Sequence, residues 1–322
     1  MRVIVYGVGA IGGTVAVALA RSGAEVVGIA RGPQLDAMRD HGLTLLAPKE
    51  EISMTVPVVA QPSEIPFRPD DCILLTMKTQ DTAEALGALR DAGVTDQPIF
   101  CAQNGVTNER LAARIFPNVH GVAVMMPATF LEPGRAIVHV APRFGIFDLG
   151  QFPLGETSVD MSFAALLEAA NIAAFPQADV MASKYGKLLL NLSNILEALM
   201  GHGAARGDLP NLLRAEALTV YDAAGIAYSD VGVADPRRDA LIRWTDVTGA
   251  PRKGGSTTQS LLRGTGRLET DWLNGEIALL GRLHGVPTPL NAALCRLGAQ
   301  LARGDLQHGT LTLEDLEHEL RV

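Results

Sequence analysis

Three glycines near the start of the chain have the spacing of a phosphate-binding turn. The segment GVGAIG at residues 7–12 follows the apolar run at residues 2–6, and an alanine-rich stretch then leads to a second apolar run at residues 25–30. In a strand–turn–helix unit, one glycine permits the tight turn, one a close backbone approach to a pyrophosphate, and one close helix–strand packing. Backbone N–H groups at the helix start then attract the phosphates. The expected cofactor contacts here are Gly7, Gly9, Ala10, Ile11 and Gly12; the alternative is a glycine turn without a ligand.

The end of the second apolar run indicates which dinucleotide is bound. Sites for NAD usually place an Asp or Glu there, about 20 residues after the glycines, to hold the ribose hydroxyls. This chain instead has Arg31 between Ala30 and Gly32, with no acid. A planar guanidinium pairs well with a 2′-phosphate. The sequence therefore favours NADP(H) with Arg31 as a contact, and the alternative is a surface arginine without a ligand.

A lysine and two asparagines form a polar stripe on an otherwise apolar helix. Residues 183–199 predict a buried helix, and Lys187, Asn191 and Asn194 fall at positions i, i+4 and i+7 on one face. Burial of such a stripe is costly unless it faces a polar cleft, where a partly desolvated lysine suits proton donation. The alternative is a hydrogen-bonded stripe between helices, with an exposed lysine. Lys184 competes for the role, but it lies about 60° away around the helix and lacks amide partners.

A second polar cluster occupies residues 254–275. Ser256, Thr257 and Thr258 are expected in a glycine-rich loop, and Glu269 and Asp271 precede a helix over 272–284. Acidic groups at a helix start favour the helix dipole, so capping is the simpler interpretation of these two acids.

The elements that must position these residues predict an α/β protein. Strands are expected at 43–48, 52–60, 72–77, 99–102 and 120–126, with helices at 34–41, 82–92 and 108–115 and a hairpin joining 128–131 to 136–140. Repeated βα units predict a mostly parallel sheet with helices on both faces, and ligands bind beyond the carboxyl ends of such strands. Lys78 and Asn104 follow two of these strands.

Beyond about residue 178 the pattern predicts helices only. They are expected near 180–200, 211–224, 236–247, 270–284, 289–303 and 312–320. We therefore expect an N-terminal Rossmann dinucleotide-binding domain over 1–178 and a C-terminal all-helical substrate and dimerisation domain over 179–322, with the active site between them.

Composition limits the classes of partner. The chain has 322 residues, 48% of them hydrophobic, and a formal net charge of −8, which disfavours a nucleic-acid or anionic-membrane partner. The start of the chain has no signal-peptide pattern, and no apolar run has the length of a membrane span. Cys72, Cys101 and Cys295 are widely spaced in apolar surroundings, as expected for reduced thiols in the cytoplasm, and they do not form a metal set.

Several of these segments together resemble the ketopantoate reductase (2-dehydropantoate 2-reductase) family over essentially the whole chain. They are GVGAIGG at 7–13, Arg31, TMK at 76–78, QNG at 103–105, KLLLN at 187–191 and ETDWLNG at 269–275. The resemblance implies NADPH-dependent reduction of a 2-keto acid to a 2-hydroxy acid, most directly ketopantoate to pantoate in pantothenate and coenzyme A biosynthesis.

The resemblance also implies residue roles. Lys187 would be the general acid, and Glu269 would orient the substrate hydroxyl or the lysine. Asn104 would hold the nicotinamide end of the cofactor and the substrate. Asn191 would also bind the substrate, and Ser256 would bind the carboxylate of the substrate. Lys78 would line the cofactor cleft, and Arg31 would take the 2′-phosphate.

Three departures from the family pattern concern substrate contacts. The second asparagine usually follows the lysine by eight residues, where this chain has Ile195, so Asn194 stands one residue early. The spacing from Gln259 to Glu269 is one residue longer than usual, which leaves Thr257 as an alternative to Ser256. The loop 249–258 also differs. The sequence therefore does not decide which keto acid is the substrate. The alternative functions are a related reductase of another hydroxy acid or opine and a non-catalytic NADP(H)-binding regulator. The oligomeric state is also open, and a dimer is favoured.

Overall fold

The computed structural model describes residues 1–232, 234–252, 254–262, 264 and 266–322, without the side chain of Leu262. The chain divides into two compact units. The first unit comprises Met1–Gln103, Thr107–Lys184 and Val233–Arg252, and the second comprises Asn104–Val106, Tyr185–Gly232 and Lys253–Val322. Residues 179–184 and 234–252 thus lie in the first unit, whereas the sequence assigns them to the second domain. Among the described residues, no helix has both the length and the apolar character needed to cross a bilayer.

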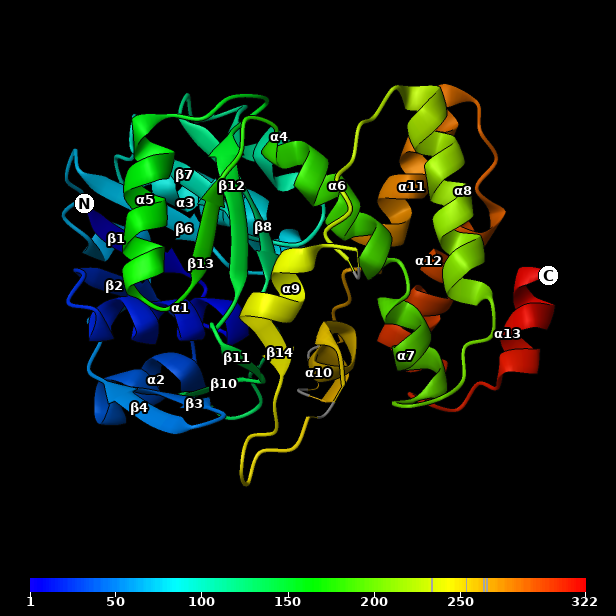
Figure 1. Cartoon of the computed structure of the whole chain (residues 1–322), viewed down its shortest axis with the longest axis horizontal. Helices are drawn as coiled ribbons and strands as arrows, with labels where there is room; N and C mark the ends of the chain where they lie inside the picture. The colour runs from blue at the N-terminus through cyan, green and yellow to red at the C-terminus, as the bar shows by residue number, and fades with distance from the viewer. Residues whose placement is uncertain (233, 253, 263, 265) are drawn as a thin grey trace. The chain divides into compact units, whose positions relative to one another are not determined.

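The first unit is built on an eight-stranded, mostly parallel sheet (Figure 1). The strand order is β13-β12-β8-β7-β6-β1-β2-β5, and only the β12–β8 pair is antiparallel. The strands are β1 (Arg2–Tyr6), β2 (Val26–Ile29), β5 (Val58–Val59), β6 (Asp71–Leu75), β7 (Ile99–Cys101), β8 (Val119–Met125), β12 (Ile146–Gln151) and β13 (Ala173–Pro176). This arrangement confirms the predicted Rossmann-type α/β fold.

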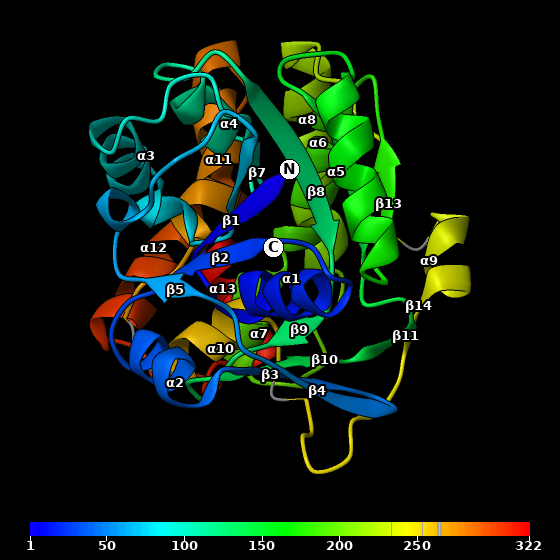
Figure 2. The same ribbon diagram turned by 90° about the vertical axis from the view of Figure 1, so that its left-hand side faces the viewer.

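Helices cover both faces of this sheet because its strands are apolar on both sides. They are α1 (Ala10–Arg21), α2 (Pro33–His41), α3 (Thr82–Asp91), α4 (Asn108–Ala112) and α5 (Ser158–Ala169), with short 3₁₀ turns η1 (Pro62–Glu64) and η2 (Thr79–Asp81). In β1, Ile4 packs in a buried cluster with Leu86 and Leu89 of α3, whereas Val5 faces α1. Figure 2 shows α1 and α3 on opposite sides of β1 and β2.

A second sheet packs against the other side of α1, which is a correction to the prediction. The sequence predicts that 43–48 and 52–60 extend the main sheet, and within these two ranges only β5 (Val58–Val59) does so, beside β2. Instead β3 (Leu43–Ala47) and β4 (Glu50–Met54) pair with each other and join β10 (Arg135–Val138) and β9 (Ala128–Thr129) in the order β4-β3-β10-β9. The short connection from β3 to β4 favours antiparallel pairing within the hairpin. The β9–β10 hairpin was predicted correctly.

A third, two-stranded sheet replaces part of an expected helix. The prediction of a helix over 236–247 is confirmed as far as Leu241 and wrong beyond it, because α9 (Pro236–Leu241) ends there and β14 (Ile242–Trp244) pairs antiparallel with β11 (Val140–Pro142). Long-range pairing with β11 supplies the backbone partners that a continued helix would otherwise provide. The expectation of helices alone beyond residue 178 is therefore also wrong.

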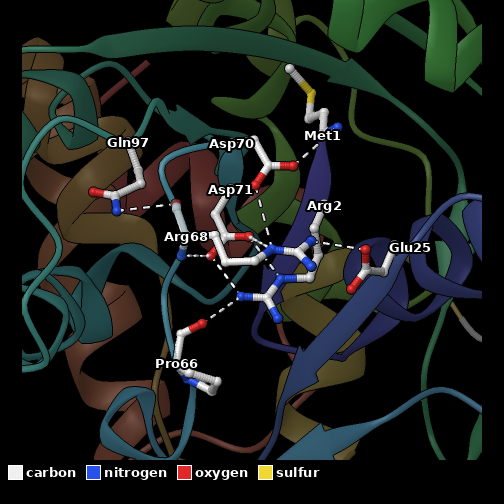
Figure 3. Close-up of polar contacts among 8 residues, drawn as sticks. All are labelled: Met1, Arg2, Glu25, Pro66, Arg68, Asp70, Asp71 and Gln97. Carbon is white, nitrogen blue, oxygen red and sulfur yellow. Dashed lines mark hydrogen bonds and ion pairs between the residues drawn. The ribbon is translucent and has the colours of Figure 1, made fainter.

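An ion-pair network fixes the amino ends of β1 and β6 (Figure 3). Arg2 donates to both carboxylate oxygens of buried Asp71 at 2.7 Å and to the Pro66 carbonyl at 2.9 Å. Arg68 pairs with Glu25 at 2.8 Å and donates its backbone N–H to Asp71 at 2.7 Å. Because two hydrogen bonds tie Arg2 to Asp71 side by side, the register of β1 against β6 is fixed at this end. The opposite ends of these strands carry the glycine turn and Lys78.

In the second unit, all regular elements of the described residues are helices. Besides the end of α6 (Val180–Asn191), they are α7 (Asn194–Met200), α8 (Leu209–Ala224), α10 (Ser256–Leu262), α11 (Thr270–His284), α12 (Pro289–Arg303) and α13 (Leu313–Leu320). Helices α8, α11 and α12 pack side by side, as Figure 1 shows.

The continuous helix expected over 180–200 is interrupted at Leu192 and Ser193, which corrects the prediction. Asn274 in α11 donates its side-chain N–H to the Leu192 carbonyl at 3.0 Å and to Asn291 at 2.9 Å. The side-chain N–H of Asn291 in turn donates to the carboxylate of Glu216 in α8 at 2.8 Å. A partner from another helix thus satisfies the Leu192 carbonyl where the helix is interrupted.

Candidate functional site

The glycine turn connects β1 to α1, and its first glycine is required by close packing. Gly7 has a φ of +99°, and a Cβ built there would lie 2.6 Å from the backbone nitrogen of Met77. The Gly7 N–H donates to the Ile29 carbonyl at 3.0 Å. A side chain at this position would therefore push apart the ends of β1 and the segment after β6.

The other two glycines differ from each other in what surrounds them. A Cβ on Gly12 would collide with the Gly7 carbonyl oxygen and lie 2.5 Å from Thr76 Oγ1. Around a Cβ built on Gly9, the described residues place no heavy atom within 4 Å. Gly9 thus borders open space at the helix start, next to Ala10 and Ile11, where backbone N–H groups attract anions. The turn therefore leaves room for an anion beside Gly9.

Arg31 follows β2 at the carboxyl edge of the sheet, and it lies beside two acids. Its side chain is 63% exposed, and its guanidinium is 3.8 Å from both Asp81 and Glu84. Burial raises the pKa of nearby Tyr6, and the Arg31 charge opposes that rise. Arg31 is therefore accessible to a phosphate, which would compete with Asp81 and Glu84.

Lys78 lies three residues beyond the end of β6 and directly precedes η2, and a buried polar network lies under this segment. Sequence reasoning missed this network, because its members come from three separate segments. Gln103 donates to Thr82 at 3.1 Å, Thr82 donates to Asn108 at 2.8 Å, and Asn108 donates to Thr79 at 3.2 Å. These hydrogen bonds join the segment after β6, which includes Lys78, to the segment after β7.

Lys187 and Asn191 lie one turn apart in the part of α6 that belongs to the second unit. Lys187 is partly exposed, and Asn191 is the last residue of the helix. Asn191 is only 6% exposed, and among the described residues its side-chain nitrogen has no hydrogen-bond partner. A buried amide N–H without a partner is costly, so it indicates a place for an external acceptor. Asn194 begins α7 after the interruption, so it does not continue the face of α6.

Lys184 has a structural partner inside the first unit. It forms an ion pair with Glu109, and it also donates to the carbonyls of Cys101 at 3.1 Å and Gln103 at 3.2 Å. Both side chains are nearly excluded from solvent, at 2% and 0% exposure. Burial raises the pKa of Glu109, and the charge of Lys184 opposes that rise. Lys184 therefore holds the end of β7 and is not available to a substrate.

Asn104 and Glu269 belong to segments that pack together in the second unit. Gly105 has a φ of +81°, and a Cβ built there would lie 3.1 Å from the Trp272 carbonyl oxygen in the first turn of α11. Glu269 is the buried residue at the N-cap of α11, but its side chain does not cap the helix. The capping interpretation therefore does not explain Glu269. Asp271 does lie in the first helical turn.

Ser256 begins α10, so the prediction of a loop at 256–258 is corrected to a helix start. Ser256 is exposed, whereas Thr257 and Thr258 are buried. Glu197 is a buried acid in α7 that is bonded to this segment, and the sequence patterns did not predict its involvement. A charged residue inside the apolar run NILEALM was the available signal.

The expected chemistry divides between the two units. All the residues expected to contact substrate or transfer a proton belong to the second unit: Lys187, Glu269, Asn104, Asn191, Asn194 and Ser256. The glycine turn, Arg31 and Lys78 belong to the first. In the described part of the chain, no group of three or more His, Cys, Asp or Glu side chains is arranged to hold a metal ion.

Comparison with known proteins gives one consistent family. The family described as "Ketopantoate reductase PanE/ApbA" matches residues 3–153, and "Ketopantoate reductase PanE/ApbA C terminal" matches residues 179–302. A protein named 2-dehydropantoate 2-reductase from Mesorhizobium japonicum is 30% identical, over 94% of this chain and 98% of its own length. Another protein of that name, from Pyrococcus horikoshii, is 27% identical over 92% of this chain and 96% of its own length.

Solved structures have the same fold. A PanE/ApbA family ketopantoate reductase from Ralstonia eutropha superposes with a TM-score of 0.75 at 27% identity, covering 94% of this chain and 99% of its own. A ternary structure of D-mandelate dehydrogenase with NADH and anilino(oxo)acetate has a TM-score of 0.74 at 22% identity, and the match covers 100% of both chains.

Proposed function

The chain belongs to the ketopantoate reductase family, and we propose that it reduces a 2-keto acid to a 2-hydroxy acid with NADPH. The substrate that the family membership favours is 2-dehydropantoate, and the product is pantoate, an intermediate of pantothenate and coenzyme A biosynthesis. Relatives that cover nearly the whole chain carry the name 2-dehydropantoate 2-reductase.

The observation that carries this proposal is the pair Lys187 and Asn191 in α6. Asn191 has a buried side-chain N–H without a partner among the described residues, one turn from a partly exposed lysine. A substrate oxygen would satisfy that N–H and come within reach of the ammonium group. Lys187 then acts as the general acid, because the former carbonyl oxygen becomes negative as the ketone is reduced and must gain a proton.

The residues of the first unit fit a nicotinamide dinucleotide. NADPH supplies the hydride when it is bound. The open space at Gly9 accommodates the pyrophosphate against the N–H groups at the start of α1, and Arg31 binds the 2′-phosphate. Lys78 lines the cofactor site at the end of β6.

The remaining residues of the second unit orient the substrate. The exposed hydroxyl of Ser256 donates a hydrogen bond to the substrate carboxylate. Thr257 is buried, which favours Ser256 over Thr257 for this role. Asn104 holds the nicotinamide end and the substrate. Glu269 orients the substrate hydroxyl or Lys187, as its match to the family pattern implies. Asn194 serves as a substrate contact in place of the displaced second asparagine.

A panel of 2-keto acids tests the proposal. NADPH oxidation is followed at 340 nm with ketopantoate, phenylglyoxylate, pyruvate and 2-oxoglutarate, and the substrates are ranked by kcat/KM. We expect ketopantoate to rank first. A different first substrate would indicate a reductase of another hydroxy acid with the same architecture. Tight NADPH binding without turnover of any substrate would indicate a non-catalytic regulator and would refute the proposal.

We also propose a homodimer and a cytoplasmic location. Leu279 and Leu283 lie one turn apart on α11 and are 45% and 66% exposed, which suits an apolar contact between copies. Cys72, Cys101 and Cys295 are free thiols, as in a reducing compartment. Light scattering of the purified protein measures its mass, and a monomer would contradict the first of these proposals. We assign nucleotide binding to residues 1–178 and substrate binding to residues 179–322 together with Asn104.

A further inference from the structure

Glu197 in α7 is a buried acid that the proposed reaction does not use. It is only 7% exposed, and one carboxylate oxygen accepts the backbone N–H of Gly255 at 2.5 Å and the hydroxyl of Thr258 at 3.1 Å. The other oxygen accepts from Arg206 at 3.2 Å. Burial by itself raises the pKa of Glu197, but these donors and the Arg206 charge outweigh burial and lower it. The carboxylate is therefore ionised and fully engaged.

Its partners bracket the start of α10, which packs beside α7 (Figure 1). Gly254 has a φ of +93°, and a Cβ built there would collide with the Glu197 carboxylate and lie 2.9 Å from the Thr258 side chain. Gln259 donates its side-chain N–H to the Gly254 carbonyl at 3.2 Å and closes the turn. Residues 254–259 are thus held against α7 in one conformation.

This arrangement decides which hydroxyl is presented to solvent. Gly255 and Thr258 flank Ser256 and Thr257, and both flanking residues are bonded to Glu197. With the flanks fixed, Thr257 is buried at 5% exposure and Ser256 is exposed. A rotation of this first helical turn would exchange the two side chains, and Glu197 opposes such a rotation.

We propose that Glu197 is a positioning residue, which anchors the start of α10 so that Ser256 offers its hydroxyl to the carboxylate of the 2-keto acid. This inference rests on the proposed function, in which Ser256 contacts the substrate. An acid near a substrate anion would normally repel it. The guanidinium of Arg206 offsets the charge of Glu197 and limits that repulsion.

Kinetics of Glu197→Ala and Glu197→Gln test the proposal, with the first-ranked 2-keto acid of the panel as substrate. Glu197→Ala should raise KM at least about tenfold, the loss expected for one substrate hydrogen bond, while kcat changes by less than about threefold. Glu197→Gln keeps an acceptor for Gly255 and Thr258 and should recover most of the wild-type KM. The NADPH dissociation constant should stay unchanged in both variants.

Glu216→Ala is the matched control. Glu216 is a carboxylate of the same unit that accepts the backbone N–H groups of Leu290 and Asn291 at 2.9 Å, so it anchors the start of α12 in the same way. Its removal should lower stability without changing KM. Ser256→Ala should raise KM as Glu197→Ala does, and the double variant should be no worse than either alone, because both changes remove one contact.

Hydrogen exchange gives a second readout that does not depend on turnover. Amides of residues 254–261 should exchange faster in Glu197→Ala than in wild type or in Glu216→Ala. An unchanged KM, unchanged exchange over 254–261, or an equal rise of KM in Glu216→Ala would each overturn the proposal. Absence of turnover in the wild-type protein would instead refute the proposed function, and the exchange measurement would still decide whether Glu197 anchors α10.

Discussion

Lys184 and Glu109 form a buried ion pair, and this pair distinguishes the two lysines of α6. Lys184 points into the first unit and holds the Cys101 and Gln103 carbonyls. Lys187, three residues later, is partly exposed in the second unit beside the unpartnered amide of Asn191. Lys184 therefore has a structural task, and Lys187 is the lysine that we propose for proton transfer.

The first prediction concerns Lys187 as the general acid. Lys187→Ala should lower kcat with ketopantoate at least about 10²-fold, because the developing alkoxide loses its proton donor. NADPH affinity, measured by fluorescence titration, should remain close to that of wild type. The exposed Lys49 provides the control, and Lys49→Ala should leave kcat unchanged. Full turnover in Lys187→Ala would assign the proton transfer to another group.

Lys184 should matter for stability. Lys184→Ala leaves Glu109 buried without a cation, which typically costs about 3–5 kcal/mol, so urea unfolding should show a large loss. The double variant Lys184→Met with Glu109→Leu should recover part of that loss, because it removes both buried charges. A loss below about 1 kcal/mol in Lys184→Ala would contradict the buried pair. Where the single variant remains folded, its kcat should fall far less than in Lys187→Ala.

The glycine turn gives a prediction that separates binding from folding. Gly9→Val should retain the fold, because the described residues leave space for a side chain at this position. It should abolish NADPH binding, because the valine side chain would fill the space that the pyrophosphate would occupy. Gly12→Val should unfold the protein, since its side chain would collide with the Gly7 carbonyl oxygen. Circular dichroism and calorimetric NADPH titration report the two properties. Normal binding in a folded Gly9→Val protein would show that the nucleotide lies elsewhere.

Cofactor selectivity should depend on Arg31. Arg31→Ala should weaken NADPH binding by about 1.5–3 kcal/mol, as expected for a charged hydrogen bond, and barely affect NADH. Dissociation constants for both cofactors measure this, and equal losses would contradict a 2′-phosphate contact.

The acid beside Arg31 makes an opposite prediction. Glu84 is exposed and lies 3.8 Å from the guanidinium. Glu84→Gln should tighten NADPH binding, because the 2′-phosphate no longer competes with the Glu84 carboxylate for Arg31. The gain should be only about 1.5- to 5-fold, since an exposed ion pair contributes little free energy. NADH binding should not change. Weaker NADPH binding in this variant would show that Glu84 supports the phosphate site.

A buried carboxylate should make stability pH-dependent. Asp160 accepts from His120 at 2.7 Å, and it caps α5 through Thr157. Burial raises the pKa of Asp160, but the bonds from His120 and Thr157 outweigh burial and lower it below the ordinary 3.8. A lowered folded-state pKa means that the stabilisation is fully present above about pH 3.8 and is lost as the pH falls through the folded value.

Asp160→Asn should therefore lose about 1–3 kcal/mol at pH 7, and the difference from wild type should shrink below pH 3.8. Asp315→Asn is the control, because Asp315 forms the same capping box with Thr312 on exposed α13. Its effect should be smaller. A pH-independent difference between Asp160→Asn and wild type would contradict the lowered pKa.

The sequence by itself determined the features that depend on local spacing. The turn at residues 7–12 could be predicted because the spacing G-x-G-x-x-G stands between an apolar run and an alanine-rich stretch. The i, i+4 relation of Lys187 and Asn191 follows from helical geometry alone. The mostly parallel sheet follows from alternation of apolar strands and helices.

The tertiary structure decided what depends on distant partners. Glu109 removes Lys184 from solvent, Asn274 satisfies the carbonyl where the helix is interrupted before Asn194, and Glu197 sets the start of α10. These contacts join residues 58 to 82 positions apart in the chain. Helix and strand periodicity describes one element at a time, whereas a buried charge or carbonyl is satisfied by whichever distant segment packs against it.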